Sequence, residues 1–184
     1  LLDKGTSKRT APQIAHELGV MGAEFEVSAS YDYTLVSASG LSTQAEKLLA
    51  KFNELVTEPS FSRAEVERVR RQTLAQIERR IDNPGAFAEI AFAHQLYGNH
   101  PYGQPVSGTL RTVKNIRRKH IIQHYLRFYR PNNAILAVVG KYTPELARQV
   151  EETFGRWETR QVPEPKFPLV QRPAGLRIRL MDKP

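Results

Sequence analysis

The stretch RRQTLAQIERRIDNP, residues 70–84, has the pattern of a charged helix that runs into a proline. Asn83 and Pro84 predict the end of this helix, because the residue before a proline is biased away from helical backbone. Apolar or small side chains recur at helical spacing on one side of it, at Val66, Val69, Thr73, Ile77 and Ile81. Near the middle, Gln76 places a neutral amide among Arg and Glu neighbours. Position 76 is therefore a candidate for a specific role, or for the loss of one.

Patterns on both sides of this helix predict a mixture of helices and strands. Helices are predicted over residues 11–21, 42–56, 62–82, 84–98, 115–129 and 143–154. Alternation of apolar and polar residues over 23–40 predicts two strands or one long bent strand. The continuous apolar run in 133–140 predicts a buried strand. Together these patterns indicate an α+β domain.

The composition and periodicity of the sequence change after Trp157, and this change predicts three parts of the chain. Residues 1–160 are expected to form most of one domain. Residues 161–174 are rich in proline and lack periodicity, which is typical of an extended linker. Alternation returns in 175–184, which are expected to begin the first strand of a second domain.

Composition excludes several classes of site. The 184 residues include no cysteine, which excludes disulfides, thiolate metal sites and cysteine nucleophiles. No apolar run reaches the roughly 18 residues that a membrane span needs. The net charge of +8 raises the possibility of nucleic-acid binding, but basic residues alternate with acidic ones, which favours solvated helix faces. We expect neither nucleic-acid binding nor a membrane span.

Catalytic motifs that the chain could carry on its own are missing or incomplete. It has no G-x-S-x-G sequence and no glycine-rich phosphate loop. His120 and His124 have the four-residue spacing of zinc ligands on a helix, but Ile121 stands where such a motif needs a glutamate as general base. A pair of surface histidines is the preferred interpretation.

Several segments in order along the chain resemble one family of peptidases. They are KGT at 4–6, LYGNHPYG at 96–103, GT at 108–109 and NNAILAVVG at 132–140. This combination resembles the pitrilysin-type or insulinase-type (M16) zinc peptidases, which carry an inverted His-x-x-Glu-His motif and include processing peptidases. The resemblance covers nearly the whole chain. It implies a layered α+β domain with an antiparallel sheet and helices on one face, here without its N-terminal part.

The resemblance also implies where a zinc site would lie. In active members the histidine motif precedes the segment that matches LLDKGT, which would place it before Leu1. A glutamate further on is the third zinc ligand, and this position corresponds to Gln76. A supporting glutamate seven residues earlier corresponds to Val69. Seven residues are close to two helical turns, so both positions share a face. Glu78 is the only nearby alternative ligand, but two residues turn it about 200° away from that face.

A third departure lies along the predicted strand that borders the substrate cleft in this family. Active relatives read N-A-x-T-S-x-D-Y-T, whereas this chain reads EVSASYDYT at 26–34. Asp32, Tyr33 and Thr34 remain, whereas the asparagine and first threonine are replaced. The substrate-binding candidates are Glu26, Val27, Ser28 and Ala29. A strand edge binds an extended peptide through backbone groups, so this edge could persist where catalysis is lost.

The resemblance implies a catalytically degenerate subunit without zinc of its own. Its expected partner is a homologous zinc-bearing subunit, with which it would enclose a chamber for peptide substrates. We expect a bacterial periplasmic location from the branch that the sequence most resembles. Two alternatives stay open: an active zinc-dependent metalloendopeptidase, and a stand-alone binding or scaffold module with a basic surface.

Overall fold

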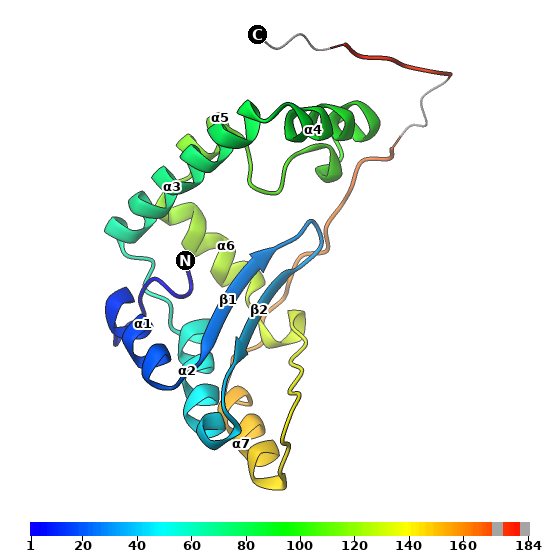
Figure 1. Cartoon of the computed structure of the whole chain (residues 1–184). Helices are drawn as coiled ribbons and strands as arrows, with labels where there is room; N and C mark the ends of the chain where they lie inside the picture. The colour runs from blue at the N-terminus through cyan, green and yellow to red at the C-terminus, as the bar shows by residue number, and fades with distance from the viewer. Residues whose placement is uncertain (171–174, 181–184) are drawn as a thin grey trace. The chain divides into compact units, whose positions relative to one another are not determined.

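A computed structural model describes residues 1–170 and 175–180 as a helix-rich fold with one small sheet (Figure 1). The seven α-helices of the described residues are α1 (Ala11–Val20), α2 (Ala45–Thr57), α3 (Arg63–Asp82), α4 (Pro84–Tyr97), α5 (Leu110–Asn115), α6 (Arg118–Phe128) and α7 (Pro144–Phe154). The two strands that pair in the described part are β1 (Glu24–Ala29) and β2 (Thr34–Ser39). Short 3-10 helices are η1 (Ser42–Gln44), η2 (Pro101–Gly103) and η3 (Pro131–Asn133).

The chain divides into two compact units. Unit 1 comprises Leu1–Ser28, Thr34–Glu67 and Arg117–Pro163. Unit 2 comprises Ala29–Tyr33, Arg68–Ile116 and Glu164–Pro184. Most of the hairpin and helices α1, α2, α6 and α7 therefore belong to unit 1, and most of α3 with α4 and α5 belongs to unit 2.

The core of unit 1 lies on one side of the β1–β2 hairpin. One buried cluster contains Ile14, Leu18 and Leu55, and a second contains Leu2, Phe61 and Val66. Phe25 of β1 packs against both clusters, and its ring lies 6.0 Å from that of Phe52 on α2. Side chains of α6 join the second cluster, and Figure 1 shows α2 and α6 behind the same side of the hairpin. An antiparallel sheet with helices on one face confirms the predicted α+β class.

Capping explains why α3 and α4 begin and end where they do. The Ser62 hydroxyl accepts a hydrogen bond from the Glu65 amide at 3.3 Å, just before α3. Asn83 interrupts the helical path, and its side-chain oxygen accepts from the Ala86 amide at 2.9 Å to open α4. The helix predicted over 62–82 is therefore confirmed with a shift of one residue at its start.

The GNHPYG turn after α4 depends on its two glycines. Gly98 follows the helix with a φ of 54°, a left-handed conformation that favours glycine. Gly103 packs on this residue so closely that an added Cβ would lie 2.5 Å from the Gly98 carbonyl oxygen. The turn therefore folds back on the end of α4 and fixes His100 and Tyr102 between the two glycines.

The helix predicted over 115–129 is wrong at its start. Asn115 is the last residue of α5 and does not cap the following helix. The chain is extended at Ile116 and Arg117, and α6 begins at Arg118. The Arg117 amide donates to Nδ1 of His120 at 3.2 Å, so a histidine caps this end. The residue types that usually cap helices did not identify this start, because an imidazole nitrogen is an uncommon acceptor at the beginning of a helix.

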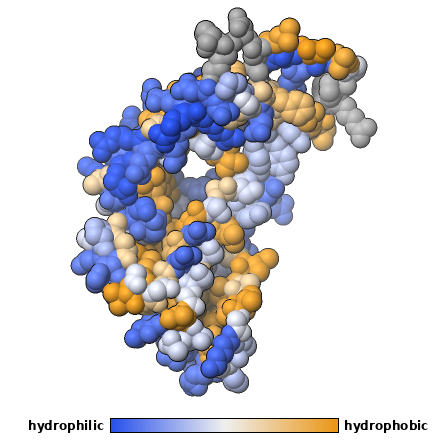
Figure 2. Space-filling view, in the orientation of Figure 1, coloured by the Kyte–Doolittle hydropathy of each residue, from blue (hydrophilic) through white to orange (hydrophobic). Residues whose placement is uncertain are grey.

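The buried strand predicted over 133–140 is also wrong for the described chain. Residues 134–139 are extended without a ladder partner, and Ile135 and Val139 are 100% and 95% exposed. Apolar residues along this segment lie at the surface in the space-filling view (Figure 2). An apolar run carries β propensity, but a strand also needs a neighbour for its backbone hydrogen bonds.

The last part of the chain leaves the predicted domain division untested. Residues 176–180 are extended and exposed, and the described structure assigns them no strand. Residues 171–174 and 181–184 of the predicted linker and second-domain strand lie outside the described residues. The boundaries 1–160, 161–174 and 175–184 stay predictions. Within the described residues, none of the helices has the length and apolar character that crossing a membrane requires.

Candidate functional site

Helix α3 carries the two positions that the sequence singled out for a metal. Val69 and Gln76 both lie in the part of α3 that belongs to unit 2. Their spacing is close to two helical turns, so they lie on one face. The Gln76 side chain is exposed and Val69 is half-buried. Hydrophilic residues cover much of α3 in Figure 2.

The donors on this face do not fit a zinc ion. Gln76 offers a neutral amide oxygen, which is a much poorer ligand for a dication than a carboxylate. Val69 has no polar atom and can neither bind a metal nor orient a ligand. Among residues 1–170 and 175–180, no three histidine, aspartate or glutamate side chains cluster as a metal site. Neither Gln76 nor Val69 therefore offers the negatively charged oxygen that a zinc site on this face would need.

The four predicted substrate-binding residues lie together on β1. Glu26, Val27, Ser28 and Ala29 are all exposed, whereas their neighbour Phe25 packs into the core. Side chains alternate along a strand, so Glu26 and Ser28 point away from the side that carries Phe25. Glu26 forms no ion pair with any described residue. The strand therefore presents an exposed acidic side chain on the face opposite Phe25.

The substrate-binding candidates and the metal-site candidates lie on different elements, β1 and α3. Glu26, Val27 and Ser28 belong to unit 1, and Ala29 is the first residue of the hairpin turn segment in unit 2. Val69 and Gln76 belong to unit 2. Their roles as positions of a lost metal site and of a substrate edge remain predictions.

A charged network in unit 1 escaped the sequence analysis. Oε2 of the buried Glu54 accepts from Arg9 at 2.6 Å and from Lys51 at 3.2 Å, and Oε1 accepts from the Thr6 hydroxyl at 2.6 Å. Glu17 pairs with the same two cations, at 2.8 Å to Arg9 and in a short contact to Lys51. The network joins the 4–10 loop to α1 and α2. Its members are far apart in sequence, and only the spacing of Lys51 and Glu54 on one helix gave any signal.

Hydrogen bonding favours the ionised form of both acids in this network. Burial acts to raise the pKa of Glu54, but the hydrogen bonds that its carboxylate accepts outweigh burial and lower the pKa. Hydrogen bonds from Lys51 and Arg9 lower the pKa of Glu17. Both carboxylates are therefore ionised at neutral pH and stabilise the fold.

We expect the stability of unit 1 to fall in acid for this reason. A carboxyl whose pKa is lower in the folded state contributes stability above its unfolded pKa and loses it as pH falls through the folded pKa. The free energy of unfolding should therefore decline as pH falls from the unfolded pKa of Glu54 and Glu17 through their folded values. Urea unfolding followed by circular dichroism at a series of pH values measures this. In a Glu17→Gln, Glu54→Gln double variant the decline should be visibly smaller, and an unchanged decline would contradict the assignment.

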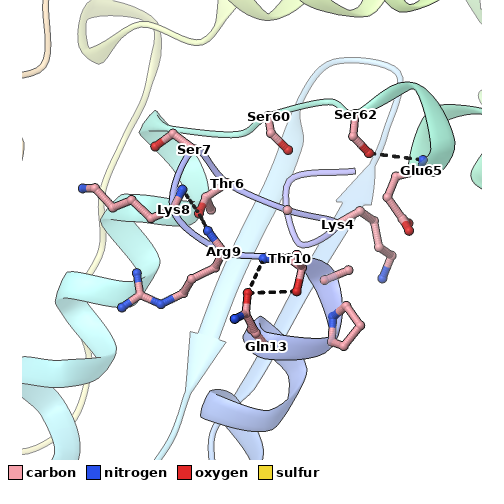
Figure 3. Close-up of a pocket in the computed structure, with 13 residues that line it drawn as sticks. Lys4, Thr6, Ser7, Lys8, Arg9, Thr10, Gln13, Ser60, Ser62 and Glu65 are labelled. Carbon is pink, nitrogen blue, oxygen red and sulfur yellow. Dashed lines mark hydrogen bonds between the residues drawn. The ribbon is translucent and has the colours of Figure 1, made fainter.

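A cavity of about 370 Å³ lies beside this network in unit 1 (Figure 3). The loop before α1 and the start of α3 line it with Lys4, Gly5, Thr6, Ser7, Lys8, Arg9, Thr10, Ala11, Pro12, Gln13, Ser60, Ser62 and Glu65. Its cations already have acidic partners, because Lys4 pairs with Asp3 and Lys8 with Glu58. Thr10 and Gln13 form the predicted capping box at the start of α1. The polar groups of the cavity wall hold the loop in place, and we assign no ligand to them.

A second cluster that the sequence analysis missed surrounds the hairpin turn in unit 2. The Tyr102 hydroxyl donates to Oδ1 of Asp32 at 2.7 Å. The ring of Tyr102 lies 5.0 Å from Tyr31, 5.6 Å from Tyr97 and 4.7 Å from His100. Asp32 and the LYGNHPYG segment were visible as motif pieces, but nothing in the sequence paired them.

The sequence of this chain matches models of known protein families. The family model described as insulinase, peptidase family M16, matches residues 1–110, which is more than half of the chain. The chain belongs to the M16 peptidase family. A second model, described as the peptidase M16 inactive domain, matches residues 115–184. The resemblance seen in the sequence is thereby confirmed.

Two relatives that carry the name zinc protease illustrate the extent of the similarity. An uncharacterized zinc protease of Rickettsia bellii is 28% identical over 82% of this chain and 37% of its own length. An uncharacterized zinc protease of Mycobacterium leprae is 31% identical over 84% of this chain and 35% of its own. The chain thus spans about a third of the length of these relatives.

Solved structures agree on the fold. A peptidase M16 inactive domain from Pseudomonas fluorescens has a TM-score of 0.79 at 25% identity and covers 94% of this chain and 42% of that one. A protease from Helicobacter pylori has a TM-score of 0.83 at 23% identity, over 91% and 42%. The first half of the periplasmic protease PqqL from Escherichia coli has a TM-score of 0.76 at 20% identity, over 90% and 37%. At identities below 25%, the similarity of the last two shows the fold alone.

Proposed function

We propose that this chain is part of a catalytically degenerate M16 subunit that pairs with a zinc-bearing homologue. Together the two subunits would enclose a chamber that degrades or processes peptides. The observation that carries this proposal is the α3 face on which Gln76 and Val69 stand two turns apart. They occupy the positions where the family resemblance expects a zinc ligand and its supporting acid.

The physical argument is one of charge. A glutamate beside zinc supplies a negative oxygen that offsets the charge of the dication, and a second acid orients the first by hydrogen bonding. Glutamine removes the charge and valine removes the hydrogen bond. A single replacement would leave part of the site intact, whereas these two together remove both contributions of the helix. A site under selection for metal binding would not carry both.

The exposed strand supports a remaining role in peptide binding. An extended peptide can add to the edge of a sheet through backbone hydrogen bonds, and this requires no metal. Glu26 to Ala29 of β1 are exposed, and the core side of the strand is fixed by Phe25. The chain could thus hold one side of a substrate while its partner supplies the chemistry.

Two other functions have an observation in their favour. The curated relatives carry the name zinc protease, which supports an active metalloendopeptidase whose third ligand comes from elsewhere. The net charge of +8 supports a binding module that uses a basic surface without a peptidase partner. Neither explains why two linked positions on α3 lack acids.

Zinc content and activity of the full-length protein test the proposal. We expect clearly sub-stoichiometric zinc by plasma emission spectrometry when the protein is purified alone. We expect peptidase activity only after a zinc-bearing homologue is added, with a gain of at least about a hundredfold, because a catalytic metal supplies several kcal/mol of transition-state stabilisation. Stoichiometric zinc together with activity of the protein alone would overturn the proposal.

A Gln76→Ala variant serves as the control within the same experiment. It should leave the activity of the mixture unchanged if Gln76 no longer binds metal. If activity of the protein alone depended on Gln76, the metalloendopeptidase alternative would be correct. A basic binding module would show neither zinc nor activity, and would not co-purify with a zinc-bearing homologue.

We also propose a periplasmic location. The PqqL protease that shares this fold is described as periplasmic, which supports the proposal by analogy of fold. Fractionation of the source cells, followed by immunodetection, tests it directly. Recovery with the cytoplasmic fraction would overturn it.

A further inference from the structure

The aromatic cluster of unit 2 holds the ring of His100 in a fixed orientation. This ring lies 4.7 Å from that of Tyr102 and 6.1 Å from that of Tyr97. Its Nδ1 accepts a hydrogen bond from the Tyr102 amide at 3.2 Å, so the ring cannot rotate without losing this bond. Tyr102 is itself fixed at its other end, because its hydroxyl donates to Asp32 at 2.7 Å. His100, Tyr97 and Tyr102 therefore form a preorganised aromatic surface, which we call the ring platform.

A residue from a distant part of the sequence, but from the same unit, lies on this platform. The ring centroid of Phe167 is 5.4 Å from that of His100, and the two planes are tilted by 46°. Pro165 and Pro168 flank Phe167, and the proline that follows restricts Phe167 to extended backbone. Residues 164–170, which we call the strap, contain no helix or strand. The prolines thus present Phe167 on a stretch of chain that loses little entropy when it docks.

Phe167 is the residue on which docking of the strap depends. Its side chain is 55% exposed, whereas Leu169, two residues further on, is 96% exposed. Among the residues that the structure describes, no hydrogen bond or ion pair holds the strap. A single aromatic pair of this kind favours the docked over the released strap by roughly fivefold, which corresponds to about 1 kcal/mol. A bias of this size keeps the strap docked for most of the time but lets it open readily.

We propose that the ring platform is a binding site for Phe167, which closes the strap reversibly over the turn that contains His100. The site takes an aromatic side chain on proline-restricted, extended backbone, and its occupant is the strap of the same chain. Residues 175–184 are predicted to begin a second domain, so docking of Phe167 would restrain the point from which that domain starts. All residues of this contact belong to unit 2, and the inference does not depend on the proposed peptidase function.

Limited trypsin digestion of the full-length protein measures how often the strap is open. Trypsin cleaves after lysine and arginine, and the bond between Lys166 and Phe167 lies within the strap. This bond can enter the protease only after Phe167 leaves the platform. Cleavage after Arg160, which lies outside the strap, is the internal reference, and mass spectrometry gives the ratio of the two initial rates.

His100→Asn tests the platform, because asparagine keeps an acceptor for the Tyr102 amide but has no aromatic ring. We expect the ratio of cleavage after Lys166 to cleavage after Arg160 to rise roughly fivefold. His94→Asn is the matched control, because it makes the same replacement at an exposed position of α4, and no described contact joins His94 to the strap. This control should leave the ratio unchanged.

Phe167→Ala tests the strap without altering the turn, because Phe167 lies on a segment that has no secondary structure of its own. Synthetic peptides of residues 158–170, with either residue at this position, correct for the direct effect of alanine on trypsin. After this correction the ratio should again rise roughly fivefold. Adding His100→Asn to Phe167→Ala should cause no further rise, since the contact is already lost. Phe167→Tyr retains the ring and should keep the ratio of the unchanged protein.

Each result supports the inference or overturns it. Equal ratios for His100→Asn and His94→Asn would show that the ring of His100 does not hold the strap. A corrected ratio for Phe167→Ala no higher than that of the unchanged protein would exclude Phe167 from the contact. Full additivity of His100→Asn and Phe167→Ala would mean that the two residues act separately. If circular dichroism showed His100→Asn to be unfolded, Phe167→Ala and Phe167→Tyr would decide the question by themselves.

Discussion

Replacing Glu54 with glutamine is expected to lower the free energy of unfolding by about 3 kcal/mol, because the buried Lys51 and the half-buried Arg9 each lose one of their two negative partners. Glu54 and Lys51 are 7% and 6% exposed, so water can replace little of what is lost. Glutamine is close in shape and retains one acceptor, so the loss is mainly one of charge and not of packing. Glu17 continues to pair with Arg9 and Lys51, which keeps the expected loss at the lower end for a broken buried pair.

Urea unfolding followed by circular dichroism measures this loss, and Glu58→Gln provides the matched control. Glu58 lies four residues further along at the end of α2, and its carboxylate accepts from Ser7 at 2.8 Å and from Lys8 at 2.9 Å. The Lys8 side chain is 60% exposed, and ion pairs at such sites contribute little. We expect Glu58→Gln to change stability by less than about 1 kcal/mol. If the two substitutions lowered the free energy of unfolding equally, burial of the network would not determine its contribution to stability.

Leu55→Ala is expected to lower the free energy of unfolding by about 3 to 4 kcal/mol. Leu55 is fully buried, at 0% exposure, in the cluster that also contains Ile14 and Leu18. Removing its branched end loses apolar burial and leaves a cavity that close-packed neighbours can fill only in part. Phe25 packs on the same cluster, so the position of β1 depends on this core as well.

The control for this substitution is Leu35→Ala on β2, which removes the same atoms from a side chain that is 53% exposed. Its expected cost is about 1 kcal/mol or less, since a half-exposed leucine loses little burial and leaves no enclosed cavity. Urea midpoints of both variants at one pH give the comparison. A loss at Leu55 no larger than that at Leu35 would contradict the assignment of the core.

The helices were largely predictable because their signals are local. The Ser62 cap and the Asn83–Pro84 break act within one or two turns, and the structure places α3 between them. The start of α6 was not predictable in this way, because an arginine and a histidine replace the usual capping residues. The strand predicted over 133–140 was wrong for a different reason. Its apolar residues indicate strand propensity, but the partner that a strand requires cannot be read from the run itself.

The residue types and the shared helix face of the candidate site were predictable from the sequence, whereas the burial and the neighbours of these residues were not. The identities of Gln76 and Val69, and the helical period that puts them on one face, follow from the sequence alone. The exposure of Gln76 and the half-burial of Val69 do not follow from the sequence. The acid–base network around Glu54 and the tyrosine cluster around Asp32 were both missed, because each joins residues roughly 40 to 70 positions apart.

The sequence by itself thus determined the family, the helical period of α3 and the presence of a glutamine and a valine on one face of it. These depend on residue identity and on spacing within a few turns, which covalent geometry fixes before folding. Only the tertiary structure decided that Glu54 lies buried between two cations and that Tyr102 holds Asp32 at an exposed turn. Contacts of this kind form between distant segments, so their energies depend on burial and direction, which exist only once the chain has folded.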